Sequence, residues 1–296
     1  MSAPHDPTDR FAAGSGFIRR EARVLEQRLF ATVFEGAPAE GVLAALAGYR
    51  NADGGFGHGL EPDKLCPASL AIDVEMALLT MAAAGTVDHA MVDGACTFLA
   101  SITEDGAVPL AAPVIEGYPR AEHWSDWTYR PGVNPTAGLA GLLHLLGVDH
   151  PWRKAATAWC WSALEAGLPD DAHALRGALI FLAHVDDQER ATAVAARIPE
   201  HLTNVSHLRL DPHDPSYGVT PLDYAPRPSS RWRSLFSDET IAGHLDRLQA
   251  DQQPDGGWAL TWQPPSQAAT LAYRGIQTLH ALRVLTAYGR TAPATR

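Results

Sequence analysis

Apolar residues recur at helical spacing along most of the chain, and turns rich in Gly and Pro separate the stretches. Apolar positions three and four residues apart predict amphipathic helices, and no stretch shows the alternation typical of a strand. The pattern predicts an all-α protein of about eleven helices. Helices are expected at residues 17–34, 38–49, 69–84, 90–102, 136–146, 152–166, 172–184, 188–196 and 267–288, with a further helix capped by Ser237.

A short pattern occurs twice at corresponding points between these helices. It reads Asp-Gly-Gly-Phe at residues 53–56 and Asp-Gly-Gly-Trp at residues 255–258, so the copies lie 202 positions apart. A degenerate third copy begins at Asp105, 52 positions after the first. A period of about fifty residues is typical of a repeated helical hairpin. Paired glycines permit the tight turn that joins the two helices of such a hairpin.

Several of the predicted helices are apolar on nearly every side, namely those at residues 69–84, 136–146 and 268–285. All-round apolarity predicts burial on more than one face. The inner helices of a double-layered ring meet this condition, so the sequence favours a closed α/α toroid over an open solenoid. We expect a flexible N-terminus at residues 1–15, one toroid domain at residues 16–290 and a C-terminal tail at residues 291–296.

Composition narrows the classes of partner. The net charge of −11 repels phosphate backbones and anionic lipid, which argues against binding of nucleic acid or a membrane surface. No apolar run is long enough to span a bilayer, and no N-terminal signal region is visible. Three scattered cysteines suggest a reducing compartment. These features predict a soluble cytoplasmic protein and leave its oligomeric state open.

The second copy of the repeat resembles a known motif. Leu248-x3-Gln252-x3-Gly256-x-Trp258 is similar to the QW motif of squalene–hopene-type terpene cyclases, whose fold the protein prenyltransferase β-subunits share. The first copy differs, with Arg50 and Phe56 at the Gln and Trp positions. In that superfamily the motif stabilises the ring. The resemblance implies an α/α toroid that binds a hydrophobic or isoprenoid small molecule in a central cavity.

The acids of those enzymes have no counterpart here. Bacterial class II cyclases carry an Asp-x-Asp-Asp-Thr-Ala segment at an inner helix, and the nearest match is Gly-Val-Asn-Pro-Thr-Ala at residues 132–137. Thr136 fits, but Asn134 and its neighbours stand where the acids would be. The Asp, Cys and His zinc set of the prenyltransferases is also unmatched. The chemistry must therefore come from other residues.

The loop after the first repeat supplies two acidic candidates. Glu61 and Asp63 are expected at the mouth of the ring, where paired carboxyl groups can take different pKa values and act in acid–base catalysis. The alternative is helix capping plus a surface ion pair with Lys64. Asp126 is a third catalytic candidate. Asp73 and Glu75, two apart on a predicted helix, point to different faces and are expected to be structural.

Aromatic and polar residues in loops are candidates for the substrate-binding wall. In the first long loop, residues 109–133, aromatic rings can stabilise a carbocation, or the tryptophans can simply pin the loop onto the ring. In the second long loop, residues 207–231, Arg227 and its neighbours can meet a diphosphate or carboxylate, or form a solvated edge. The substrate-binding candidates are His58, Trp124, Trp127, Tyr129, Asn134, Tyr217, Tyr224, Trp258 and Trp262.

Three functions follow from these residues and the resemblance. The resemblance implies an enzyme that performs acid-initiated cyclisation or prenyl-type transfer on a hydrophobic or isoprenoid molecule. A polysaccharide lyase or hydrolase of the α/α-toroid type would need two carboxylates facing across a groove. A non-catalytic binding protein would retain the ring alone. No metal site and no cofactor are expected, and Mg²⁺ enters only with a diphosphate substrate.

Overall fold

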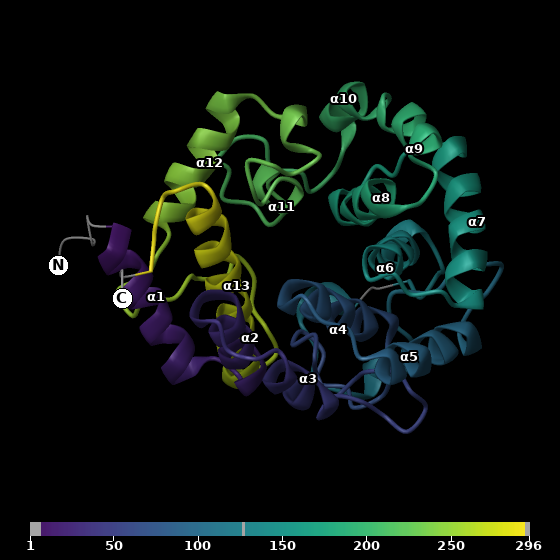
Figure 1. The fold of residues 1–296 in the computed structure, drawn as a ribbon, viewed down its shortest axis with the longest axis horizontal. Coiled ribbons are helices and arrows are strands. Elements are labelled where there is room, and N and C mark those ends of the chain that lie inside the picture. Colours follow the sequence, from purple (N-terminus) through teal and green to yellow (C-terminus); the bar gives the residue numbers. More distant parts are fainter. Residues whose placement is uncertain (1–6, 126–127, 294–296) are drawn as a thin grey trace. The chain divides into compact units, whose positions relative to one another are not determined.

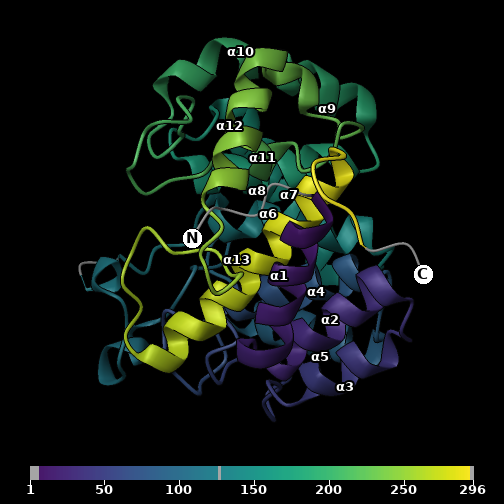
Figure 2. The same ribbon diagram turned by 90° about the vertical axis from the view of Figure 1, so that its left-hand side faces the viewer.

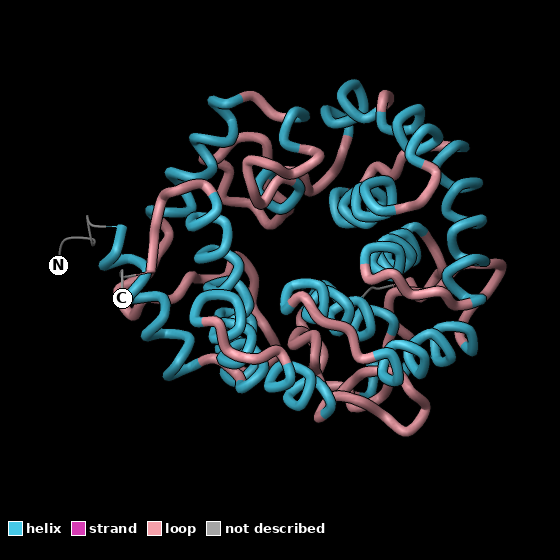
Figure 3. Tube along the Cα trace, in the orientation of Figure 1, coloured by secondary structure: helices cyan, strands magenta, loops and turns pink. Residues whose placement is uncertain are grey.

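The computed structural model describes residues 7–125 and 128–293, in which helices form nearly all of the regular structure and only isolated bridges pair extended residues (Figure 3). The all-α prediction is confirmed. Contacts divide the chain into two compact units, where the sequence predicted a single domain over residues 16–290. Unit 1 comprises Met1–Pro38 and Leu208–Arg296, and unit 2 comprises Ala39–His207. The closed toroid stays a prediction.

Unit 2 consists of helical hairpins whose members lie in two layers (Figure 1). One layer contains α4 (Ala71–Ala84), α6 (Val133–Leu145) and α8 (Ala172–His184). The other contains α5 (His89–Ser101), α7 (Pro151–Ala166) and α9 (Gln188–Ala195), while α3 (Glu40–Ala47) packs on α4 and the short α10 (Ile198–His201) follows α9. The expected helices of this unit are confirmed, with ends shifted by a few residues. The layer of α4, α6 and α8 is the more deeply buried one. Within it, α6 has buried residues on every side.

Glycines bring α6 and α8 unusually close together. A Cβ atom at Gly141 would lie 2.5 Å from the backbone nitrogen of Phe181 and 2.6 Å from its Cα. Gly177 of α8 approaches Gly138 of α6, where a Cβ would lie 3.1 Å from the Gly138 nitrogen. Side chains at these positions would push the two backbones apart.

We therefore expect Gly141→Ala to destabilise the fold by about 1–3 kcal/mol or more, because the Phe181 backbone cannot move aside as a flexible side chain would. Urea denaturation would measure the loss. Gly132→Ala is the matched control, since a Cβ at Gly132 meets nothing within 4 Å. Equal midpoints for the two variants would contradict the close packing.

Unit 1 is built around the long helix α13 (Gln267–Ala287), which contacts α1 (Pro7–Glu21), α2 (Val24–Glu35) and α12 (Asp238–Ala250). Figure 2 shows α13 running beside α1. The prediction of one helix at residues 17–34 is wrong, because the chain breaks at Arg23, whose backbone is extended. The close approach of Gly275 on α13 to Ala22 accompanies the break. The expected flexible segment 1–15 is helical from Pro7 onward.

The second long loop also holds more structure than expected. It contains the short helix α11 (Pro221–Tyr224), which packs against α12. A capping box formed by Thr220 and Asp223 begins this helix: the Asp223 carboxylate accepts from the Thr220 nitrogen at 2.7 Å. Further along, the Ser237 hydroxyl accepts a hydrogen bond from Thr240, which confirms its predicted role as the N-cap of α12.

The two copies of the repeat fold into the same turn. Asp53 and Asp255 each accept a hydrogen bond from the backbone nitrogen two residues later, at 3.0 Å in both copies. The first glycine of each pair has a positive φ, 89° at Gly54 and 93° at Gly256. A Cβ at Gly256 would overlap the carbonyl oxygen of Ala13 on α1. The prediction that the glycines form tight turns is confirmed.

The Gln and Trp of the second copy stabilise the joint that they belong to. The Gln252 side-chain nitrogen donates to the carbonyl oxygen of Arg10 at 3.0 Å and to that of Gly256 at 2.9 Å. The Trp258 indole is 3% exposed and donates to the carbonyl oxygen of Leu248 at 2.8 Å. The motif thus fastens α12 to α1. No helix within the described residues is long and apolar enough to cross a membrane.

Candidate functional site

Four ionisable side chains gather in the interior of unit 2, where the loop after the first repeat meets the start of α4. Glu61 and Asp63 are each 3% exposed, and Lys64 and Asp73 are each 1% exposed. Ionised groups so far from water are costly unless other charges and hydrogen bonds compensate them. The cluster is therefore the most strongly charged part of the described interior and the first place to look for chemistry.

Direct contacts hold this cluster together. The Lys64 ammonium and the Glu61 carboxylate form a buried ion pair. The backbone nitrogen of Glu61 donates to Asp73 Oδ1 at 2.8 Å, so the carboxylate in the first turn of α4 fixes the loop. The ion pair that the sequence predicted for the surface lies inside the protein instead. The catalytic roles of Glu61 and Asp63 stay predictions.

The first long loop closes over the cluster. Trp124 is 3% exposed and belongs to an apolar group with Cys66, Leu70 and Ile115. The Lys64 ammonium lies 5.0 Å from the centroid of the Trp124 ring, a cation–π distance. The backbone nitrogen of Ala121 donates to the Asp63 carbonyl oxygen at 2.8 Å. Trp124 therefore pins the loop, which was one of the two roles predicted for it.

His123 is the member of this region nearest to water. Its side chain is 43% exposed, and its Nε2 lies 3.6 Å from Asp63 Oδ2. Burial of the ring lowers the pKa of His123; the charge of Glu61 opposes this change and that of Lys64 adds to it. A neutral imidazole beside a carboxylate can accept a proton at neutral pH. The His123–Asp63 pair is thus the solvent-facing edge of the cluster.

A second carboxyl group of α4 is in a different environment. Glu75 lies on a stripe of half-buried residues, with the apolar Ile72, Met76 and Leu79 at helical spacing around it. Burial raises the pKa of Glu75 to about 7, although the positive charge of Arg176 on α8 works in the opposite direction. The Glu75 carboxyl group thus keeps its proton to a higher pH than an ordinary glutamate does. Such a group suits general acid catalysis.

Packing with α6 fixes the position of the Glu75 carboxyl group. A Cβ atom at Gly138 would overlap Glu75 Oε1, so only glycine leaves room for the carboxyl group against α6. Ile72, one turn before Glu75, packs against the apolar group around Trp124 together with Tyr129. The stripe on α4 therefore runs from the first long loop to the carboxyl group, and its side chains remain partly open to solvent.

The raised pKa predicts a dependence of stability on pH. The folded state holds the Glu75 proton up to about pH 7, whereas an unfolded glutamate releases it near pH 4.5. The free energy of unfolding should therefore fall as the pH rises from 4.5 to about 7, by at most about 3 kcal/mol from this residue. Glu75→Gln should lack this component, which urea denaturation at pH 5 and pH 8 would measure. The same pH profile for both proteins would contradict the assignment.

The other predicted site residues of unit 2 have surroundings of their own. His58 is exposed, and its Nε2 lies 2.8 Å from the side-chain oxygen of Asn51. Burial raises the pKa of Tyr129, which hydrogen-bonds to Glu116. Asn134 is half-buried at the start of α6, in a non-helical conformation. Asp126 and Trp127 lie outside the described residues.

The predicted aromatic residues of unit 1 form one open group and one buried group. Tyr217 and Trp262 meet edge to face at 5.6 Å, and Trp262 meets Tyr273 of α13 at 5.0 Å. Tyr217 is 42% exposed, whereas Trp262 and Tyr273 are half-buried. Tyr224 is 4% exposed and packs on Phe236. Trp258 is also buried, in the turn of the second repeat. The substrate-binding roles of Tyr217 and Trp262 stay predictions.

Several of these residues escaped the sequence analysis for a definable reason. Glu75 was predicted to be structural, because its spacing from Asp73 shows only that the two face different ways. Its position in an otherwise apolar stripe was the available signal. Tyr273 and Arg176 gave no signal of their own.

Among the residues that the structure describes, no group of three or more His, Cys, Asp and Glu side chains is placed to hold a metal ion.

Comparisons with known proteins inform the fold alone. No family model matches the chain, and no curated protein matches it. A solved structure of a protein from Actinoplanes is similar, with a TM-score of 0.56 and 19% sequence identity over 95% of this chain and 100% of that one. At this identity the likeness shows a shared fold.

Proposed function

We propose that this protein is an enzyme that protonates an apolar small molecule, with Glu75 as the general acid. The observation that carries the proposal is a lone carboxyl group with a pKa near 7 on the half-open apolar stripe of α4. Apolar surroundings favour the protonated form of the acid. They also favour binding of a substrate whose reacting end is uncharged. The resemblance of the repeat to the QW motif supports an isoprenoid chain as the substrate class.

The proposed reaction begins with proton transfer from Glu75 to a carbon–carbon double bond or an epoxide. The carboxylate that results lies near Arg176, whose positive charge stabilises it. The cation formed on the substrate then reacts within the substrate, which gives cyclisation, or loses a proton. A base must accept the proton that the substrate cation loses. The neutral His123 beside Asp63, in the same unit, is a candidate for this base.

The burial of the acids around Lys64 favours this reaction over polysaccharide cleavage by those acids. Sugar hydrolysis requires two carboxylates on the wall of an open groove. In unit 2, Glu61, Asp63 and Asp73 are at most 3% exposed, which gives a polysaccharide no access to them. Glu75 is the carboxyl group of α4 that combines a raised pKa with partial exposure.

The test is incubation of the purified protein with squalene, geranyl diphosphate, farnesyl diphosphate and geranylgeranyl diphosphate, with detection of products by gas chromatography and mass spectrometry. Assays with and without Mg²⁺ separate protonation from loss of diphosphate. The proposal predicts a product from at least one substrate and turnover that decreases above about pH 7 as Glu75 loses its proton. If no product forms from any of the four substrates, the isoprenoid class is rejected.

A further inference from the structure

Three aromatic rings of unit 1 meet at nearly right angles. Tyr217 belongs to the second long loop, Trp262 precedes α13, and Tyr273 lies on α13. The rings of Tyr217 and Trp262 have centroids 5.6 Å apart and planes at 83°. The rings of Trp262 and Tyr273 have centroids 5.0 Å apart and planes at 84°. The indole is therefore close to perpendicular to both phenol rings.

We propose that Tyr217, Trp262 and Tyr273 form a binding site for a quaternary ammonium group of a small molecule. Two rings at right angles bound a corner in which an ion touches the face of each ring, and these faces attract cations. Because Tyr217 is 42% exposed, its side of the site is open to solvent. The site lies within unit 1 and does not depend on the reaction proposed for Glu75.

Backbone contacts on both sides of Tyr217 hold its loop in place. The Ser216 nitrogen donates to Asp214 Oδ1 at 2.8 Å, immediately before the tyrosine. The Arg209 nitrogen donates to the Val219 carbonyl oxygen at 2.9 Å, which ties the two ends of the loop together. A ring that is already held in place loses little conformational freedom when a ligand binds.

The charges of this loop favour a cation over a neutral ligand. Residues 211–217 contain two aspartates and no lysine or arginine. Hydrogen bonds from Ser216 lower the pKa of Asp214, and the charge of Arg209 lowers it further, so this carboxylate is ionised at neutral pH. The net charge of −11 attracts cations to the protein over a longer range.

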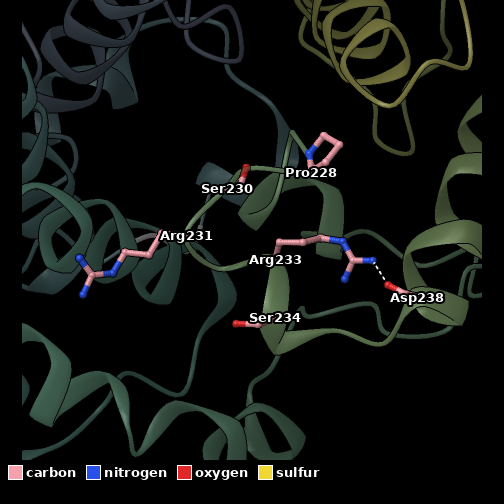
Figure 4. Close-up of a pocket in the computed structure, with 6 residues that line it drawn as sticks. All are labelled: Pro228, Ser230, Arg231, Arg233, Ser234 and Asp238. Carbon is pink, nitrogen blue, oxygen red and sulfur yellow. Dashed lines mark hydrogen bonds and ion pairs between the residues drawn. The ribbon is translucent and has the colours of Figure 1, made fainter.

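Unit 1 already holds one cation of its own over an indole ring. In the surface hollow drawn in Figure 4, Arg231 extends away from the ion pair of Arg233 with Asp238. The guanidinium carbon of Arg231 lies 5.1 Å from the centroid of the Trp232 ring, a cation–π distance. Trp232 is half-buried, as Trp262 is, so it provides a matched control whose ring already has a cation.

Isothermal titration calorimetry tests the site with choline and with the uncharged analogue of choline in which carbon replaces the ammonium nitrogen. At constant ionic strength, choline should bind more tightly than this analogue by roughly fivefold or more. Tyr217→Leu should weaken choline binding by a similar factor, because leucine is apolar but has no aromatic face. Tyr217→Phe retains the ring and should bind as the wild type does. Trp232→Leu should leave binding unchanged.

Three results would overturn the proposal. They are equal affinity for choline and its analogue, absence of choline binding at millimolar concentration, and equal choline binding by wild type and Tyr217→Leu. Trp262→Leu should weaken binding as well. Because Tyr217 is exposed in a loop, Tyr217→Leu tests the site even if Trp262→Leu folds poorly.

Discussion

Glu75→Gln is expected to lower the turnover of the substrate by a factor of about 10² to 10⁴, the usual contribution of a general acid. Glutamine keeps the shape of the protonated side chain beside Gly138 but has no proton to transfer. The variant should also lose the decrease of activity above pH 7 that deprotonation of Glu75 causes in the wild type. Steady-state kinetics from pH 5 to pH 9 would measure both effects.

A structural role for Glu75 would give a different result. Because glutamine remains neutral at every pH, Glu75→Gln should unfold at a denaturant concentration no lower than the wild type at pH 8. Loss of activity in a variant of undiminished stability thus separates catalysis from folding. Glu189→Gln, at an exposed position on α9, is the control for removal of one carboxylate. Wild-type turnover by Glu75→Gln would reject the proposed acid.

Lys64→Met should produce the largest loss of stability, about 3–5 kcal/mol, because it leaves the buried Glu61 carboxylate without its ammonium partner. Methionine fills a similar volume, so the loss would come from charge and not from a cavity. The cation–π contact with Trp124 disappears as well, which should loosen the first long loop. Urea denaturation gives the free energy, and limited proteolysis reports on the loop.

Two comparisons distinguish this effect from simple loss of a lysine. Lys154→Met removes a surface ion pair with Asp149. The two side chains are 66% and 68% exposed, so the free energy of unfolding should fall by less than about 1 kcal/mol. Adding Glu61→Gln to Lys64→Met should restore part of the stability, because the uncompensated charge is then gone. Equal costs for the two lysine variants would show that the buried pair contributes no more than a surface pair.

Local sequence predicted the helices and their joints well. Periodic apolar residues and the paired glycines of the repeat act over a few neighbours, so the pattern alone fixes α8, α12 and the two Asp-Gly-Gly turns. The errors have tertiary causes. The helix expected at residues 17–34 breaks at Arg23, near the close approach of Gly275 from a helix some 250 positions later.

The candidate site shows the same division. The sequence pointed to the loop around Glu61 and Asp63, because acids that follow a glycine turn stand out locally. It could not show that Lys64 turns inward, since that depends on the contact with Trp124, sixty positions later.

The sequence by itself determined that the chain is all-helical, repeats a hairpin and turns at its paired glycines. Those properties arise from interactions over a few residues. The tertiary structure decided what each carboxyl group of α4 does, because its surroundings in space come from distant parts of the chain. Asp73 became a buried anchor for the loop, whereas burial raised the pKa of Glu75 to about 7. Asp73 and Glu75 lie two residues apart on one helix, but Asp73 meets the loop at Glu61, whereas Glu75 meets Gly138 of α6.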